Sequence, residues 1–275
     1  MEPGRITNRC LSPFRSVVYL GLSSTLLFYG CAMGGRHSNA LLSKDRSLLL
    51  GQSIAEPSKV SSNRELVVLV HGMTRTPLSM VPLKRFLQQS GYEVLNFGYL
   101  SFGLTVRKIS EKLSVAVTQK MSEETFEKVH FVGHSLGAIV IRHMLSVKVP
   151  KQVGRVVMLA PPNQGSTRAD ALVNWLAWLY RVLPELTTNR SSTVRSLPEV
   201  PAVQVGIVAG SCDSTVRIEQ TRLNSQTDHV VVSSGHSLIM FYPEVHRRVV
   251  HFLARGSFQE ETSEPVKSSS TTVTP

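Results

Sequence analysis

The sequence has few cysteines, few acidic residues and no long apolar segment, and each shortage excludes a class of protein. Three cysteines in 275 residues do not suggest a disulfide framework. The 30 lysines and arginines outnumber the 19 aspartates and glutamates, which leaves a net charge of +11. The basic residues are scattered and no nucleic-acid-binding signature accompanies them. We therefore expect no nucleic-acid partner, but a solvated surface with affinity for anionic lipid headgroups.

The longest apolar stretch, Val17 to Tyr29, is shorter than the roughly 20 residues of a transmembrane helix. It follows a basic segment, as in a secretory signal peptide. Leu27-Phe28-Tyr29-Gly30-Cys31 then resembles a bacterial lipobox, whose cysteine would carry the lipid. We interpret residues 1–31 as a signal peptide with a lipobox, or alternatively as an uncleaved anchor or the leader of a secreted protein. The first interpretation predicts a protein of the bacterial cell envelope, tethered to the membrane and facing the periplasm.

A serine lies between two glycines in Gly133-His134-Ser135-Leu136-Gly137, at a change of pattern along the chain. The preceding residues 128–132 form a short apolar run typical of a buried strand, and residues 138–145 have the pattern of a helix. A serine at such a turn is the nucleophile elbow of a serine hydrolase, where the helix N-terminus places amide donors beside the attacked carbonyl. The alternative is a tight turn with a serine that caps the helix.

A second run, Leu66 to Val70, is β-branched and aliphatic throughout, which favours a strand buried on both faces of a parallel sheet. It ends in His71-Gly72-Met73, which resembles the His-Gly turn of lipases and esterases. That resemblance implies that the backbone N–H groups of Met73 and Leu136 form an oxyanion hole. We expect His71 to be structural, because it precedes the candidate nucleophile in the sequence.

The candidate acid and base follow the last two predicted strands. Asp213 comes just after the strand over residues 203–210, where the acid of a triad would orient and stabilise the imidazole; a turn-forming role is the alternative. His236 lies in the loop after the strand over residues 229–233. The competing residues are less well placed along the chain: Asp170, Asp228, His229, His246 and His251.

Alternating strands and helices predict an α/β fold with a mainly parallel sheet of about six strands and helices on both faces. Further strands are expected over residues 92–97 and 153–160, and helices over 77–89, 104–120 and 242–254. We place the folded domain at residues 65–255, a polar tether at 32–64 and a disordered tail at 256–275.

Both tryptophans, Trp175 and Trp178, lie in the segment 171–186, which is apolar nearly all round. Such a helix must be covered on more than one face. One interpretation is a small lid or acyl-chain groove, with the lid candidate spanning residues 168–199. The other is a helix that covers the sheet as part of the core.

With Ser135, Asp213 and His236 in this order, residues 65–254 resemble a serine lipase or esterase of the α/β-hydrolase superfamily. The nearest group includes small bacterial triacylglycerol lipases and deacylases that remodel glycolipid anchors. A further similar segment, Leu159 to Ser166, is expected to line the pocket. The resemblance implies an α/β-hydrolase fold with a small helical lid insertion and a serine hydrolase of the carboxylesterase or lipase type.

The predicted function is hydrolysis of lipid-like carboxylic esters through an acyl-enzyme, without metal or cofactor. The expected partners are a small-molecule or lipid ester and the membrane, reached through the N-terminal anchor. The larger secreted lipases' cysteine pair and calcium-site carboxylates are not evident, which argues against bulk fat as the substrate. An acyltransferase or thioesterase, and a catalytically silent envelope binding protein, are the alternatives.

Overall fold

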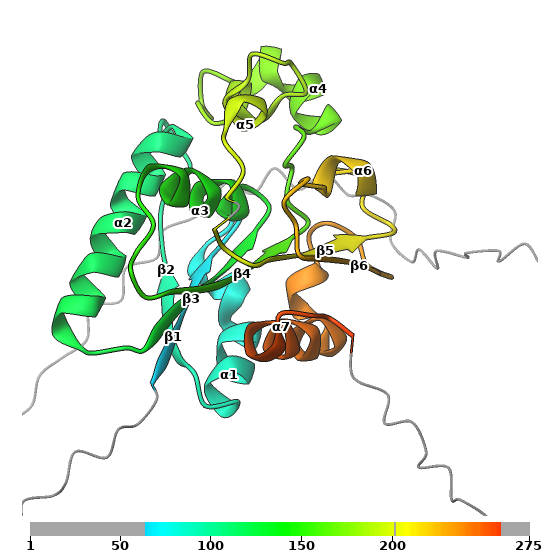
Figure 1. The fold of residues 1–275 in the computed structure, drawn as a ribbon. Helices are drawn as coiled ribbons and strands as arrows, with labels where there is room; N and C mark the ends of the chain where they lie inside the picture. The colour runs from blue at the N-terminus through cyan, green and yellow to red at the C-terminus, as the bar shows by residue number, and fades with distance from the viewer. Residues whose placement is uncertain (1–63, 201, 260–275) are drawn as a thin grey trace, which may run out of the picture. The chain divides into compact units, whose positions relative to one another are not determined.

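Six parallel strands form one sheet in the order β2-β1-β3-β4-β5-β6 in the computed structural model, which describes residues 64–200 and 202–259 (Figure 1). The strands are β1 (Glu65–Val70), β2 (Glu93–Phe97), β3 (Lys128–His134), β4 (Val153–Leu159), β5 (Val205–Gly210) and β6 (Asp228–Val232). The central strands are continuous runs of buried aliphatic residues, as parallel strands covered on both faces require. The predicted fold class is confirmed.

Two helical layers cover the sheet, one on each face (Figure 1). One layer contains α2 (Val106–Glu123) and α3 (Leu136–Val147), and the other contains α1 (Val81–Gln89) and α7 (Pro243–Arg255). A short 3-10 turn, Pro77–Met80, precedes α1, and two others lie at Pro184–Leu186 and Ile239–Phe241.

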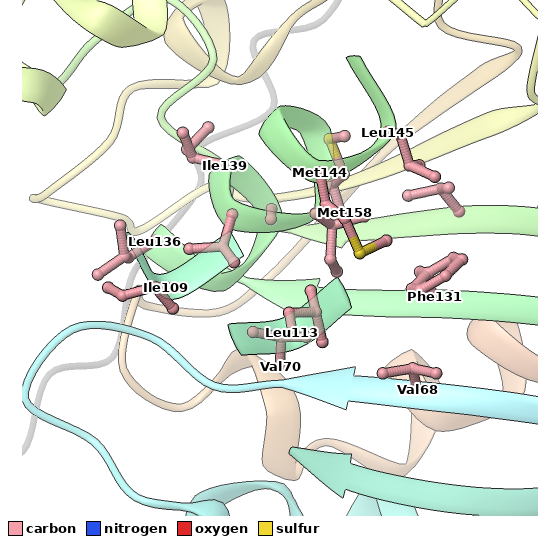
Figure 2. Close-up of a cluster of buried hydrophobic side chains, with 14 of the residues drawn as sticks. Val68, Val70, Ile109, Leu113, Phe131, Leu136, Ile139, Met144, Leu145 and Met158 are labelled. Atoms are coloured by element: carbon pink, nitrogen blue, oxygen red, sulfur yellow. The ribbon is translucent and has the colours of Figure 1, made fainter. Parts of the chain in front are cut away.

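Side-chain alternation along β1 divides the core into two clusters. Val68 and Val70 point toward α2 and α3, where they meet Phe131, Ile109 and Leu113 (Figure 2). The intervening residues Val67 and Leu69 face α1 and α7. Because successive side chains of a strand point to opposite faces, one uninterrupted aliphatic run supplies both clusters.

The lid candidate is not one continuous helix. Helix α4 (Thr167–Leu176) ends before a turn region, and the short α5 (Thr193–Ser196) precedes β5. Figure 1 shows α4 and α5 at the top of the view, apart from the two helical layers. The side chains of Trp175 and Trp178 are 78% and 79% exposed. The segment is therefore not one continuous core helix, although Val182, Leu183 and Leu186 within it are buried in the core.

Several expectations concern residues outside the described ranges. These are the signal peptide or anchor with Cys31, the tether before Arg64 and the tail from residue 260. Phe258 is buried and its ring packs on Phe252, so the packed chain continues beyond the expected boundary at residue 255.

Across residues 64–200 and 202–259, the helices are all too short or too polar to span a bilayer. The same residues contain no group of three or more histidine, cysteine, aspartate or glutamate side chains arranged to hold a metal ion.

Candidate active site

Ser135 lies at the junction of β3 and α3 in a conformation that L-amino acids rarely adopt, with φ 51° and ψ −120°. Such a backbone costs on the order of 1–3 kcal/mol and persists only where its surroundings enforce it. The neighbouring glycines explain how. A Cβ at Gly133 would lie 2.5 Å from the backbone nitrogen of Ala138, and one at Gly137 would lie 2.2 Å from the carbonyl oxygen of Val70. Neither position has room for a side chain.

The side chain of Ser135 makes no capping hydrogen bond to α3, so the alternative of a capping serine is wrong. Its Oγ instead lies 2.9 Å from Nε2 of His236, and Nδ1 of His236 lies 2.7 Å from Oδ2 of Asp213. With Nδ1 protonated, His236 donates to Asp213 and accepts from the Ser135 hydroxyl. The structure thus brings together three side chains from the loops after β3, β5 and β6.

Asp213 combines the two roles that the sequence left open. Its Oδ1 accepts hydrogen bonds from the backbone N–H groups of Thr215 and Val216, at 2.7 and 2.9 Å, as a turn-forming aspartate does. Its Oδ2 remains aimed at His236, and the carboxylate side chain is almost fully buried. The turn therefore fixes the carboxylate that orients the imidazole.

The competing residues make other contacts. Asp170 accepts from Thr188, and Asp228 accepts from the backbone of Phe258. The imidazoles of His229, His246 and His251 bond to Thr221, to the carbonyl of Met240 and to the carbonyl of Ser257, respectively. None of these hydrogen bonds involves Ser135.

The two predicted oxyanion donors both lie near Ser135. Leu136 is the first residue of α3, where backbone N–H groups have no partner within the helix. Met73 follows β1 and lines the same small cavity as Ser135. His71 is buried, stacks on Tyr99 and forms a hydrogen bond between its Nδ1 and the carbonyl of Gly72. Burial lowers the pKa of His71, in keeping with the structural role expected of it.

A cavity of about 50 Å³ adjoins Ser135. Pro162 and Ser166 contribute to its wall, as expected of the segment 159–166, and Thr215 and Val216 contribute from the loop after β5. The lid candidate supplies the rest of the wall: Arg168, Ala169, Leu172, Leu183 and Leu186. Trp175 and Trp178 are absent from this lining. Within the segment 171–186 that the sequence offers as a lid or acyl-chain groove, the leucines and not the tryptophans line the cavity.

Comparisons with known proteins agree with this architecture. The sequence model described as the alpha/beta hydrolase family matches residues 67–203, a range that ends before Asp213 and His236. No curated protein sequence matches the chain.

Several solved structures share the fold. The mature Bacillus licheniformis lipase BlEst2 aligns with a TM-score of 0.55 at 19% identity, over 65% of this chain and 87% of its own. The Pyrococcus furiosus esterase Pf2001 aligns with a TM-score of 0.55 at 22% identity, over 70% of this chain and 83% of its own. The Paleococcus ferrophilus monoacylglycerol lipase aligns with a TM-score of 0.50 at 18% identity, over 70% of this chain and 95% of its own.

Proposed function

The chain belongs to the alpha/beta hydrolase family, and from this premise we propose that it is a serine-dependent hydrolase of lipid-like carboxylic esters. The observation that carries the proposal is the continuous chain of contacts from Asp213 through His236 to the strained Ser135. A hydroxyl gains nucleophilicity when an oriented imidazole accepts its proton, and the imidazolium is stabilised by a buried carboxylate.

The geometry supports a two-step reaction. Nε2 of His236 takes the proton of Ser135 while Oγ attacks the ester carbonyl, and the backbone N–H groups of Met73 and Leu136 bind the oxyanion. His236 then protonates the leaving alcohol, and the acyl group stays on Ser135. A water molecule then attacks the acyl carbonyl and gives its proton to His236, which passes that proton to Oγ of Ser135 as the bond from Oγ to the acyl carbon breaks and the acid leaves. One oxyanion donor is worth about 2.7–4 kcal/mol of transition-state stabilisation in enzymes where this has been measured.

The acyl part of the substrate is inferred from the cavity wall. Leu172, Leu183 and Leu186 offer aliphatic contact beside Ser135, which suits an apolar acyl group. Three proteins with this fold are a lipase, an esterase and a monoacylglycerol lipase by name. We further propose that the ester is presented at a membrane surface and that the protein is tethered there in the bacterial envelope through its N-terminal segment.

The test is covalent labelling of the protein from residue 32 onward with a fluorophosphonate, followed by mapping of the adduct by mass spectrometry. The expected result is an adduct at Ser135 that is absent from Ser135→Ala. A folded wild-type protein without an adduct would overturn the proposal in favour of a silent binding protein. Parallel turnover of matched oxyesters and thioesters, with and without an alcohol acceptor, then distinguishes hydrolysis of esters from thioester cleavage or acyl transfer.

A further inference from the structure

His134, the last residue of β3, is buried among three loops that carry the candidate catalytic groups. It directly precedes Ser135 in the chain, and only 2% of its surface is exposed. Its Nε2–H donates a hydrogen bond of 3.0 Å to the backbone carbonyl of His236, from which it is separated by 102 positions. The two imidazole rings lie 5.2 Å apart.

The same ring borders the loop with the predicted oxyanion donor. A Cβ at Gly72 would lie 2.8 Å from Nδ1 of His134 and 3.3 Å from Cβ of Ser135. The imidazole of His134 therefore occupies the space that a side chain at position 72 would need. Met73 follows directly, so His134 is in contact with the nucleophile strand, the oxyanion loop and the base loop at once.

We propose that His134 is a positioning residue, which holds the carbonyl of His236 and thereby keeps its imidazole aligned between Asp213 and Ser135. The flanking residues of the base loop are held by the backbone: the N–H of Cys212 donates to Ser234, and that of Leu238 donates to Gly235. The carbonyl of His236 itself is held by the side chain of His134.

His134 performs this role as a neutral side chain. Its Nδ1 is buried and has no hydrogen-bond partner in the described structure, so a proton there would be unsatisfied. Burial, followed by the charge of the adjacent His236, lowers the pKa of His134 to about 3, and Arg75 and His71 act in the same direction. The proton from Ser135 is consequently accepted by His236 and not by His134.

The inference rests on the proposed function, and two substitutions in the full chain separate positioning from packing. His134→Gln can keep an N–H donor near the place of Nε2, whereas His134→Leu keeps apolar volume and loses the donor. Positioning predicts that kcat for a soluble ester falls at least tenfold in His134→Leu with little change in KM, and that His134→Gln restores most of it. If His134 only fills space, His134→Gln should instead lose more kcat than His134→Leu, because the glutamine oxygen would be buried without a donor.

A second measurement does not depend on turnover. Amide hydrogen exchange of residues 233–238 should be faster in His134→Leu than in the wild type and near the wild-type rate in His134→Gln, with melting temperatures measured alongside. Wild-type kcat together with unchanged exchange in His134→Leu would overturn the inference. A wild-type protein that neither turns over esters nor labels at Ser135 counts against the proposed function, and the exchange comparison still decides the role of His134.

Discussion

The guanidinium of Arg142 donates a hydrogen bond from Nη2 to the backbone carbonyl of Leu197 at 2.5 Å. Arg142 lies on α3 and is only 4% exposed, and it also donates to the carbonyls of Asn163, Val194 and Pro198. One buried cation thus joins the helix that begins beside Ser135 to the loop after β4 and to the segment around α5. These carbonyls are satisfied by a side chain because the segment around α5 forms no strand.

Replacement of this cation is predicted to destabilise the fold. Arg142→Met leaves buried carbonyls without donors, and we expect it to lower the free energy of unfolding by about 3 kcal/mol or more. The measurement is denaturant unfolding. The exposed Arg107, which pairs with Glu111 on α2, is a matched control, and Arg107→Met should stay within about 0.5 kcal/mol of wild type. Equal changes in the free energy of unfolding for the two substitutions would show that the buried hydrogen bonds of Arg142 do not stabilise the fold.

Asp213→Asn is predicted to lower kcat by about 10⁴ while the protein stays folded, because an amide can present its NH₂ to Nδ1 and favour the wrong imidazole tautomer. The asparagine oxygen can still accept from Thr215 and Val216, which preserves the turn. Steady-state kinetics and a thermal melt measure the two effects. Asp228→Asn is the control: it alters an acceptor for Phe258 and should affect stability rather than kcat. Comparable kcat values for both variants would contradict the assignment of Asp213.

Glu185 gives a prediction about pH. Its Oε2 accepts a hydrogen bond of 2.7 Å from the backbone N–H of Val106, so the lid candidate is joined to the first turn of α2. Burial raises the pKa of Glu185 above its ordinary value of 4.5, although hydrogen bonds from Val106 and Thr193 oppose this shift. The folded protein therefore binds this proton at a higher pH than the unfolded chain does.

The sign follows from proton linkage. Since the folded state binds more protons between the ordinary and the raised pKa, the contribution of Glu185 to the free energy of unfolding falls as pH rises through that interval. Glu185→Gln removes this dependence and keeps an oxygen to accept from Val106. We therefore expect the free energy of unfolding of the variant, relative to that of the wild type, to increase as pH rises from 4 to 7. Denaturant unfolding at each pH measures this difference. A difference that is constant over this range would contradict the prediction.

The sheet and the placement of the candidate site could be predicted from the sequence for a shared reason. Buried parallel strands are continuous aliphatic runs, and residues such as Ser135, Asp213 and His236 lie in the loops directly after them. The chain order of these loops then restricts which serine, acid and histidine can meet. The predicted strand boundaries fall within about two residues of those observed, whereas the segment 171–186 matches only part of α4 and continues past its end.

The remaining features depend on long-range contacts that no local pattern encodes. The partner of His134 lies 102 positions away along the chain, and the carbonyls bound by Arg142 come from two separate segments. Burial of Phe258 depends on Phe252 and Asp228, so the end of the packed chain is set by tertiary contacts. The exposure of the tryptophans could not be predicted, because the apolar content of a segment does not show which of its faces packs against the rest of the protein.

The exposed tryptophans lead to the last prediction. Phe102 packs on Tyr180, and the N–H of Gly103 donates to Leu179, so the loop with Leu100 and Phe102 adjoins the segment with the tryptophans. Leu100 is 71% exposed and Phe102 50% exposed. Together, Leu100, Phe102, Trp175 and Trp178 present apolar side chains on a protein of strongly basic charge, a composition suited to an anionic lipid surface.

The double substitution Trp175→Ala with Trp178→Ala should leave the melting temperature and the turnover of a short soluble ester near wild type, because exposed side chains add little to stability. Binding to vesicles that contain phosphatidylglycerol, and hydrolysis of esters within them, should fall at least tenfold. Val115 and Val147 are also exposed but lie on α2 and α3, so their replacement by alanine is the matched control and should change neither. Unchanged vesicle binding and acyl-chain preference in the tryptophan variant would mean that this surface takes no part in reaching a lipid substrate, and the substrate would then have to be sought among soluble esters.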